Sequence, residues 1–387
     1  MMAQQAEENQ RNSETKASVL ILGASFAGLA TAWWMHRLGY AVTLVEIAKG
    51  LRRGGTPVDI REGVVDVVRR MGLFERIAAA SLPPRPMTFL DVDGEPVAQL
   101  PARANDTEGA EAGFEIERDV LLDMLFEEVK DEVTFLFGDS VSQLQESSED
   151  VAVTFTSGRQ SAFSLVFGCD GIHSAARRLC FGEESSFSVF LQNYFSLSIV
   201  NKLLIEENTS QMFNVPGKTV MLNAYNNKTD IAFSFFSDKE IAYDYRAVDQ
   251  QKQMIRQQFE GEGWRTTELL DAMSGCDNFY FDKLCQVRMA SWTKGRVALV
   301  GDAGYCPSPA AGMGGSMAIL GAAALADAFE KYPDDFRRAY QEYDESLRPT
   351  VEAIQVQAVE FGLPMFAPRT EEDLQQRNAR LAGGDAF

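Results

Sequence analysis

Three acidic residues that could bind a ligand stand at the ends of short apolar segments. Glu46, Asp170 and Asp302 each close or follow such a segment, as Asp302 follows Val297–Val300. The last two are each next to a glycine, and a segment of helical character comes after them. A carboxylate in this place either caps the following helix or accepts hydrogen bonds from a bound molecule. For Asp170 taken alone, helix capping is the simpler interpretation.

A glycine-rich turn near the N-terminus favours the ligand interpretation. Val19–Leu22 is an all-apolar run typical of a buried parallel strand, and a helical segment ending at Gly39 and a second apolar strand follow the turn. The turn has the G-x-G-x-x-G spacing of a dinucleotide site, with serine in the middle glycine position. Its candidate contacts are Gly23, Ser25, Ala27 and Gly28. Glu46 ends the second strand, where an acid accepts hydrogen bonds from an adenosine ribose.

The order of the motifs points to a family. Gly23–Gly28, then Asp170-Gly171, then Gly301-Asp302 resembles the class A flavoprotein monooxygenases, the p-hydroxybenzoate-hydroxylase-like family, from Val19 to about Leu347. The loop RRGGTPVDIR, residues 52–61, is similar to one in the tetracycline-inactivating members. Gly304-Tyr305 departs from the usual Ala-His, and Met313 stands where the family often has glutamine.

The resemblance implies one FAD and a set of residues that hold it. Asp302 would contact the ribityl chain, Arg118 the ribityl and phosphate region, and Asp59 the flavin, while the segment 312–316 would face the pyrimidine end of the ring. The implied FAD contacts, with those of the turn and Glu46, are Arg53, Asp59, Arg118, Asp170, Asp302, Gly312, Met313, Gly314, Gly315 and Ser316. NADPH would bind transiently, and either Arg52 or Arg53 would face it.

The fold implied is α/β, a Rossmann-like FAD-binding domain with an inserted antiparallel-sheet substrate domain and a C-terminal helix. We expect a disordered tail over 1–17, the FAD-binding domain over 18–86, 101–184 and 285–348, and the substrate domain over 87–100 and 185–284. A C-terminal helix and a peripheral tail would occupy 349–387. Seven phenylalanines of the substrate domain are expected mostly in its core, with a minority lining a pocket: Phe187, Phe190, Phe195, Phe213, Phe233, Phe235 and Phe236.

Composition limits the other classes of function. The chain has 387 residues, a net charge of −20, five scattered cysteines and two histidines. The charge argues against nucleic-acid binding, and the histidine count and the absence of CxxC pairs argue against a metal centre. The apolar stretch Val19–Met35 is broken by glycines and is too short to span a membrane. We therefore expect a cytoplasmic monomer with reduced thiols, no metal and no membrane partner.

The implied activity is NAD(P)H- and O2-dependent hydroxylation of an enolic or phenolic polycyclic substrate through a flavin C4a-hydroperoxide, with tetracycline-like polyketides as the first candidates. No catalytic side chain is required, and His173 is expected to be structural. Three alternatives stay open at this point: an aromatic or polyketide hydroxylase, a geranylgeranyl-reductase-like FAD reductase, and a flavin-binding sensor.

Overall fold

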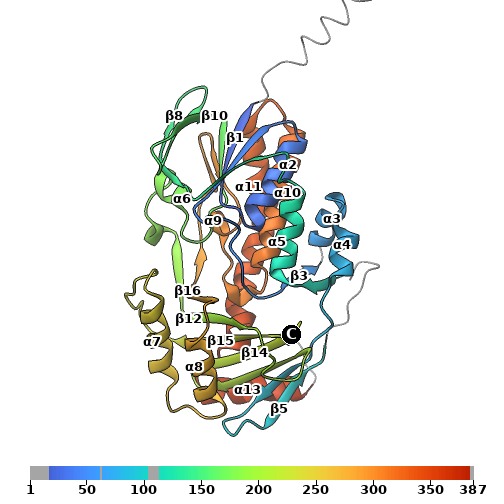
Figure 1. Ribbon diagram of the computed structural model, residues 1–387, viewed down its shortest axis with the longest axis vertical. Coiled ribbons are helices and arrows are strands. Elements are labelled where there is room, and N and C mark those ends of the chain that lie inside the picture. The colour runs from blue at the N-terminus through green and yellow to red at the C-terminus, as the bar shows by residue number, and fades with distance from the viewer. Residues whose placement is uncertain (1–16, 62, 103–112, 384–387) are drawn as a thin grey trace, which may run out of the picture.

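The computed structural model describes residues 17–61, 63–102 and 113–383, and Figure 1 shows two layered parts stacked along the long axis. The upper part contains a mainly parallel sheet with helices against it. The lower part contains a larger sheet, with helices α7 and α8 at one end. The tail predicted over 1–17 lies outside the described residues except for Ala17.

The upper sheet has six strands in the order β17-β18-β11-β1-β2-β7. All neighbours pair in parallel except β17 with β18. The central strands are apolar along their length because helices cover the sheet, and Val19, Leu20 and Ile21 have no exposed surface. The strands are β1 (Ser18–Leu22), β2 (Ala41–Glu46), β7 (Thr134–Phe137), β11 (Leu165–Gly168), β17 (Thr293–Lys294) and β18 (Val297–Leu299).

Helices α2 and α10 pack on this sheet and on each other. Further helices and two small sheets, β3–β6 and β8–β9–β10, complete the upper part. These elements are α2 (Phe26–Arg37), α3 (Gly63–Arg70), α4 (Phe74–Ala79), α5 (Arg118–Glu127), α6 (Ala175–Cys180), α9 (Asp302–Tyr305), α10 (Gly314–Lys331), β3 (Val58–Arg61), β6 (Gly113–Ile116), β8 (Val141–Glu146), β9 (Val151–Phe155) and β10 (Gln160–Phe163). Short 3-10 turns cover Glu184–Ser186 and Pro309–Ala311.

The lower sheet has seven strands in the order β16-β12-β15-β14-β13-β4-β5, and only β13 with β4 pairs in parallel. Residues 87–100, expected in the substrate domain, form the antiparallel pair β4 and β5 of this sheet. The helices α7 (Val248–Phe259) and α8 (Thr266–Ser274) cover one face. The strands are β4 (Met87–Leu90), β5 (Pro96–Leu100), β12 (Ser188–Val200), β13 (Thr209–Val215), β14 (Lys218–Tyr225), β15 (Lys228–Phe236) and β16 (Phe279–Val287).

The predicted α/β class with an inserted, largely antiparallel sheet is confirmed. The phenylalanine prediction divides by face. Phe213, Phe233 and Phe235 are buried beneath α7 and α8, whereas Phe195 packs on the opposite side with Leu191, Leu284 and Leu363.

Two expected boundaries fall inside regular elements. Strand β16 runs through the boundary at 284/285. Helix α11 (Phe336–Gln357) runs through the boundary at 348/349 with Pro349 in its interior, and it continues as a π-helical turn, Ala358–Gly362. Helix α12 (Leu363–Phe366) follows, with Pro364 in its first turn. A proline is tolerated at the first turn of a helix because the amide there needs no intrahelical partner.

The C-terminal segment lies at the surface with most of its residues exposed, but two buried side chains attach it to the lower part. Helix α13 (Glu371–Ala382) begins with a capping box between Thr370 and Asp373. Its Arg377 is only 4% exposed and donates to the side-chain oxygen of Asn214 at 2.7 Å and to the carbonyl of Met365 at 3.0 Å. The high charge of this segment suggested exposure, but one buried arginine anchors it to the seven-stranded sheet.

Candidate functional site

The predicted acids and the glycine-rich turn lie along one edge of the parallel sheet. Strands β18, β11, β1 and β2 are parallel neighbours, so their carboxyl ends meet at this edge. Asp302, Asp170, Gly23 and Glu46 each end or closely follow one of these strands. In open α/β sheets, ligands bind outside the carboxyl ends of the strands. The four motifs therefore meet where the fold places ligands.

The two glycines of the turn are required by close backbone contacts. Gly23 has a φ of +99°, and a Cβ atom there would lie 2.5 Å from the carbonyl oxygen of Cys169. A Cβ atom at Gly28 would lie 1.8 Å from the carbonyl oxygen of Gly23. Ser25 is the residue preceding α2, and Ala27 lies against Gly301. The backbone of the turn therefore folds tightly over the strand end, as a phosphate-binding turn does.

Glu46 is buried and helps to hold the turn. Its two carboxylate oxygens accept hydrogen bonds from the amides of Ala24, at 2.9 Å, and Ala48, at 2.8 Å. Each oxygen keeps acceptor capacity for a further donor, because an ionised carboxylate has about four lone-pair sites.

Asp170 connects two of the motifs. Its carboxylate accepts from the hydroxyl of Ser174 and from the amide of Ala176 at 3.0 Å, and burial raises its pKa. The buried side chain of Arg177 donates to the carbonyl of Ala303 at 2.8 Å. The contacts of Asp170 are therefore those of a residue that caps the start of α6, as the helix-capping interpretation predicted. The same turn also fixes the segment that carries Asp302.

Asp302 differs from the other acids because few protein donors serve it. Burial raises the pKa of its carboxyl to about 6, and the thiol of Cys306 is the donor that the described chain offers to its side chain. The side chain nevertheless keeps some exposure. A carboxylate that is desolvated but still reachable is suited to accept hydroxyl donors from a ligand.

The start of α10 lies against the predicted loop 52–61. Gly312 is left-handed, with a φ of +66°, and a Cβ atom at Gly315 would meet Val58 at 2.9 Å. The hydroxyl of Ser316 donates to the carbonyl of Asp59. Gly314 faces open space, and Met313 packs at the margin of the upper core. The predicted segments 312–316 and 52–61 are therefore neighbours.

The arginines of the loop have different partners. Arg53 forms an ion pair with Asp123 at 2.6 Å, and Asp59 pairs with Arg61 at 3.0 Å. Arg118, partly buried, donates to the hydroxyl of Ser25 at 3.3 Å and to the carbonyl of Arg52 at 3.1 Å.

Arg52 differs from Arg53 because no acidic side chain among the described residues pairs with it. The side chain of Arg52 is exposed and forms no ion pair within the described ranges. It is therefore the better placed of the two arginines to meet an anionic ligand.

The Ala-His departure at Gly304-Tyr305 has a structural explanation. Tyr305 is buried, its ring lies 4.5 Å from that of Trp292, and its hydroxyl accepts from Tyr343 at 2.9 Å. A Cβ atom at Gly321 would lie 1.8 Å from this hydroxyl. The tyrosine therefore extends into the core beneath α10, in space that Gly321 provides.

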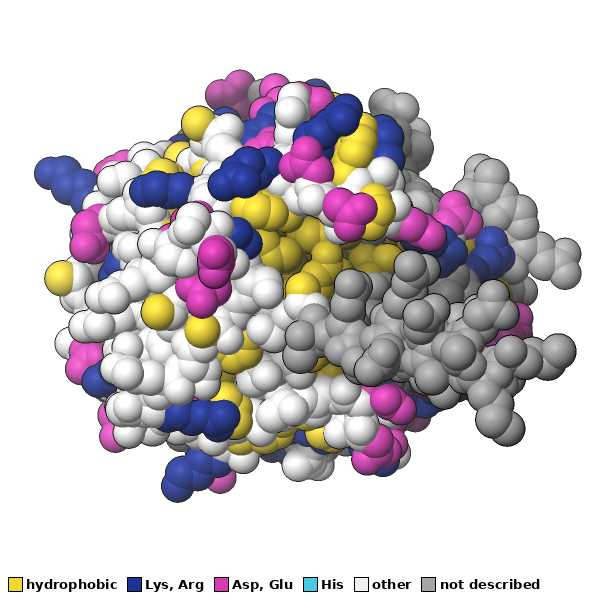
Figure 2. Space-filling model, turned by 90° about the horizontal axis from the view of Figure 1, so that it is seen from above, with side chains coloured by type: hydrophobic (Ala, Val, Ile, Leu, Met, Phe, Trp, Pro, Cys, Tyr) yellow, Lys and Arg dark blue, Asp and Glu magenta, His cyan; other side chains and the backbone are white. Residues whose placement is uncertain are grey.

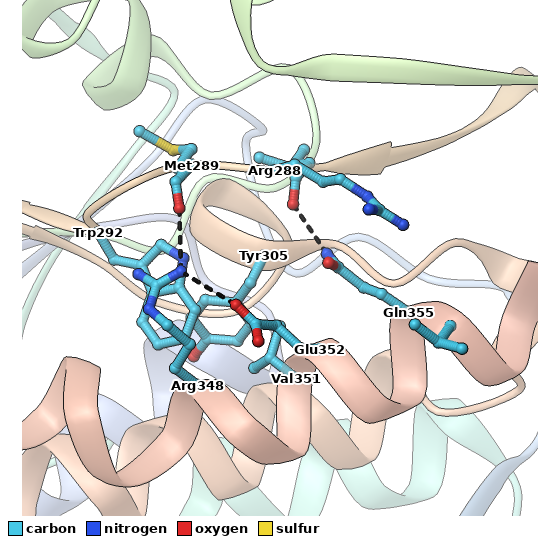
Figure 3. Close-up of a pocket in the computed structure, with 10 residues that line it drawn as sticks. Arg288, Met289, Trp292, Tyr305, Arg348, Val351, Glu352 and Gln355 are labelled. Carbon is cyan, nitrogen blue, oxygen red and sulfur yellow. Dashed lines mark hydrogen bonds and ion pairs between the residues drawn. The ribbon is translucent and has the colours of Figure 1, made fainter.

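A cavity of about 250 Å³ borders Tyr305 and helix α11, and it contains none of the predicted cofactor contacts. Figure 3 shows Arg348 over Trp292, 4.4 Å from the ring centre, and donating to the carbonyl of Met289 at 3.0 Å. Gln355 donates to the carbonyls of Val287, at 2.9 Å, and Cys306, at 3.3 Å. These contacts tie the C-terminal helix to the segment that carries Asp302.

His173 bridges two acids across the junction of the two sheets. Its ring nitrogens lie 2.9 Å from Glu184 and 2.8 Å from Asp282, which belongs to β16. The hydrogen bonds to Asp282 and Glu184 raise the pKa of His173 to about 9. A structural role was expected in the Asp170 turn, and these contacts extend it to the lower sheet.

We expect His173→Gln to destabilise the protein at pH 6 by about 1 kcal/mol, since the histidine is half-exposed and its ion pairs are screened. The folded pKa is raised, so this stabilisation is complete below about pH 6.5 and is lost as the pH rises through 9. Urea unfolding at pH 6 and pH 10 measures the difference. An equal loss of stability at both pH values would contradict the charged bridge.

Neither metal binding nor a membrane span is indicated. No group of three or more His, Cys, Asp or Glu side chains in the described residues could hold a metal ion, and the five cysteines are free. None of the helices in the described ranges has the length and apolar character needed to cross a membrane. On the face in Figure 2, basic and acidic side chains are interspersed around an apolar depression, and the described part of that face shows no continuous basic patch.

A comparison with known families identifies the kind of protein to which this chain belongs. The FAD binding domain family matches residues 16–351.

The chain belongs to this FAD-binding family.

Its relatives give the class of reaction. The chain is 33% identical to a flavin-dependent monooxygenase of Legionella longbeachae, over 87% of this chain and 86% of the relative. It is 36% identical to the uncharacterised protein Rv1260 of Mycobacterium tuberculosis, over 93% and 97%. Among solved structures, tetracycline destructase Tet(55) is 31% identical, covers 96% of both chains and superposes with a TM-score of 0.82. The protein is an FAD-dependent monooxygenase of the class A fold, as the motifs predicted, and these relatives favour that class over the reductase alternative.

The residues present fit FAD on observations of this structure. Gly23 and Ser25 of the glycine turn are partly exposed, and Arg118 lies beside Ser25. Glu46 has acceptor capacity at the end of β2 for the adenosine ribose. The described chain offers the carboxyl of Asp302 the thiol of Cys306, and ribityl hydroxyls could supply further donors. The glycine turn, Glu46 and Asp302 are therefore candidates to contact the pyrophosphate, the ribose and the ribityl chain.

Proposed function

We propose that the protein uses NADPH and O2 to hydroxylate an enolic or phenolic polycyclic substrate, with tetracyclines as the first candidates. The observation that carries the proposal is the full-length similarity to tetracycline destructase Tet(55), at a TM-score of 0.82 and 31% identity. The loop 52–61, whose pattern suggested this subgroup, lies beside the start of α10 and Arg118.

Bound FAD supplies the activation of O2 and the transfer of one oxygen atom to the substrate. The side chains have positioning and electrostatic tasks in this proposal. Asp302, Arg118 and Glu46 hold three different parts of the cofactor. The backbone of 312–316 presents amides at the start of α10, where donors favour negative charge on a reduced ring. Arg52 is the arginine assigned to the phosphates of NADPH.

The substrate would bind on the sheet face opposite α7 and α8. Of the seven phenylalanines, Phe195 is the one that packs with Ala310 of the 307–312 turn and with Leu363 of α12. This apolar group joins the lower sheet, the cofactor-binding part and the C-terminal segment. An apolar wall of this kind suits a flat polycyclic ligand and excludes water from the reacting atoms.

The decisive experiment follows NADPH oxidation by the purified FAD-loaded protein in air, with and without tetracycline, while the absorbance of the drug is recorded. We expect tetracycline to accelerate NADPH oxidation and to lose its chromophore. The FAD-free protein is the control and should do neither. Oxidation that ignores tetracycline but responds to a phenol or another polyketide would refute the substrate and leave the monooxygenase in place.

A further inference from the structure

A second, polar cavity lies between the two parts of the molecule, and the site described above does not use it. Its volume is about 200 Å³. The upper part contributes Gly55, Glu117 and Asp119, and the strands and loops of the lower sheet contribute Ile199, Asn201, Tyr225, Lys228 and Asn278. In Figure 1, α5 stands directly over this region of the lower sheet.

The cavity adjoins the loop that carries Arg52. The amide of Gly54 donates to Asp119 at 3.0 Å, and a Cβ atom at Gly54 would meet the side-chain oxygen of Asn278 at 2.5 Å. A Cβ atom at Gly55 would meet Arg118 at 2.4 Å. The loop 52–55 therefore forms one wall of the cavity, and the guanidinium of Arg118 lies directly behind it, next to Ser25 of the glycine turn.

Two side-chain amides in the cavity are available to a ligand. Asn201 and Asn278 are exposed, and their side-chain amides form no hydrogen bond within the described residues. An amide offers two donors and one acceptor, which are complementary to a carboxamide. The floor is partly apolar and aromatic, through Ile199 and the buried Tyr225, whose hydroxyl is bound to Asp230 at 3.0 Å.

The charged side chains around the cavity are held by ion pairs and hydrogen bonds. Glu117 pairs with Lys228 and accepts from Asn226 at 3.1 Å, and Asp119 lies 3.6 Å from Arg118. The cavity walls thus carry two carboxylates and one lysine, and the exposed cation Arg52 lies outside, three residues before Gly55. A ligand whose ring lies inside and gains positive charge as it reacts, with its phosphates outside, would match this arrangement.

We propose that this cavity binds the nicotinamide ring of the reduced nucleotide, with Asn201 and Asn278 on its carboxamide and Arg52 on its phosphates. Size supports a single ring, because a cavity of about 150 Å³ holds benzene and a four-ring polyketide would not fit. The nucleotide transfers one hydride (a proton with two electrons) to the oxidised cofactor and leaves as the pyridinium form. Glu117 and Asp119 would stabilise the positive charge that develops on the ring. This inference rests on the proposed use of NADPH.

The test uses the FAD-loaded protein and the double variant Asn201→Ala/Asn278→Ala, with Gln143→Ala, an exposed amide on β8, as the matched control. NADPH binding is titrated under anaerobic conditions by the fluorescence of its dihydronicotinamide, and flavin reduction is followed by stopped flow. We expect the double variant to raise the Kd for NADPH at least tenfold, with FAD affinity unchanged. The control should bind like the wild type.

A separate variant examines the electrostatic part. Glu117→Gln should slow anaerobic flavin reduction about tenfold while the Kd for NADPH changes little, since the carboxylate acts mainly on the charge that develops during hydride loss. The pocket assignment is overturned if the double variant binds NADPH as the wild type does, or if the wild type binds no NADPH. If the wild type binds NADPH and the double variant does not, but no polyketide is oxygenated, the pocket is supported and the proposed substrate is refuted.

Discussion

Replacing Asp302 with asparagine is expected to give a protein that folds at least as stably as the wild type but loses FAD readily. The carboxyl is desolvated, and its pKa of about 6 lies above the ordinary value of 3.8. Between these values the folded state holds more protons than the unfolded state. The buried charge therefore destabilises the FAD-free protein progressively as the pH rises from about 4 to about 6, and the loss reaches on the order of 1–3 kcal/mol at neutral pH.

Urea unfolding of the FAD-free proteins at pH 4.5 and pH 8 measures the change in stability, and FAD titration measures the change in FAD affinity. The asparagine variant should be more stable than the wild type at pH 8, with a clearly smaller difference at pH 4.5, where only part of the loss has developed. Its FAD affinity should fall at least tenfold, because a neutral amide accepts ribityl hydroxyls less strongly than a carboxylate does. A variant that stays fully yellow after gel filtration would refute the cofactor role of Asp302.

Gly28→Ala is expected to be the most damaging single-methyl change in the cofactor-binding part. The added Cβ would lie 1.8 Å from the carbonyl oxygen of Gly23, which is backbone and cannot rotate away. Helix α2 would have to move off β1, at a cost of about 3 kcal/mol, and the turn that faces the pyrophosphate would open. We expect lower unfolding midpoints and no retained FAD.

Gly50→Ala provides the matched control, because a Cβ atom there meets no atom within 4 Å and its φ is not in the left-handed region. Chemical denaturation and the flavin absorbance of the purified proteins compare the two variants. If the Gly28 variant binds FAD as the Gly50 variant does, the close contact between Gly23 and Gly28 is not what shapes the phosphate turn.

The cofactor-binding part was predictable because local sequence determines it. Gly23, Gly28 and the acids at strand ends follow from strand periodicity and from turns that only glycine permits. Parallel pairing then brings the ends of β1, β2, β11 and β18 together. The spacing of the motifs in the sequence does not by itself show that these strand ends are neighbours.

Other features depend on contacts between distant segments, and sequence could not supply them. The direction of Tyr305 depends on the space at Gly321, and a small residue in an apolar helix was the one available signal. The burial of Arg377 depends on Asn214, which lies more than a hundred residues earlier in the chain. The amides Asn201 and Asn278 belong to no motif, so only the folded chain brings them to one cavity.

The order in which the sheets are completed has a consequence for synthesis of the protein on the ribosome. Strand β18, at residues 297–299, pairs with β11. Strand β4, at residues 87–90, cannot pair with β13 until residues 209–215 have been synthesised. Helix α13 then packs against that sheet through Arg377 and Leu381. Neither part can close its core on a partial chain, so most apolar strands emerge before their partners. Nascent chains of this protein should therefore bind chaperones until translation is nearly finished.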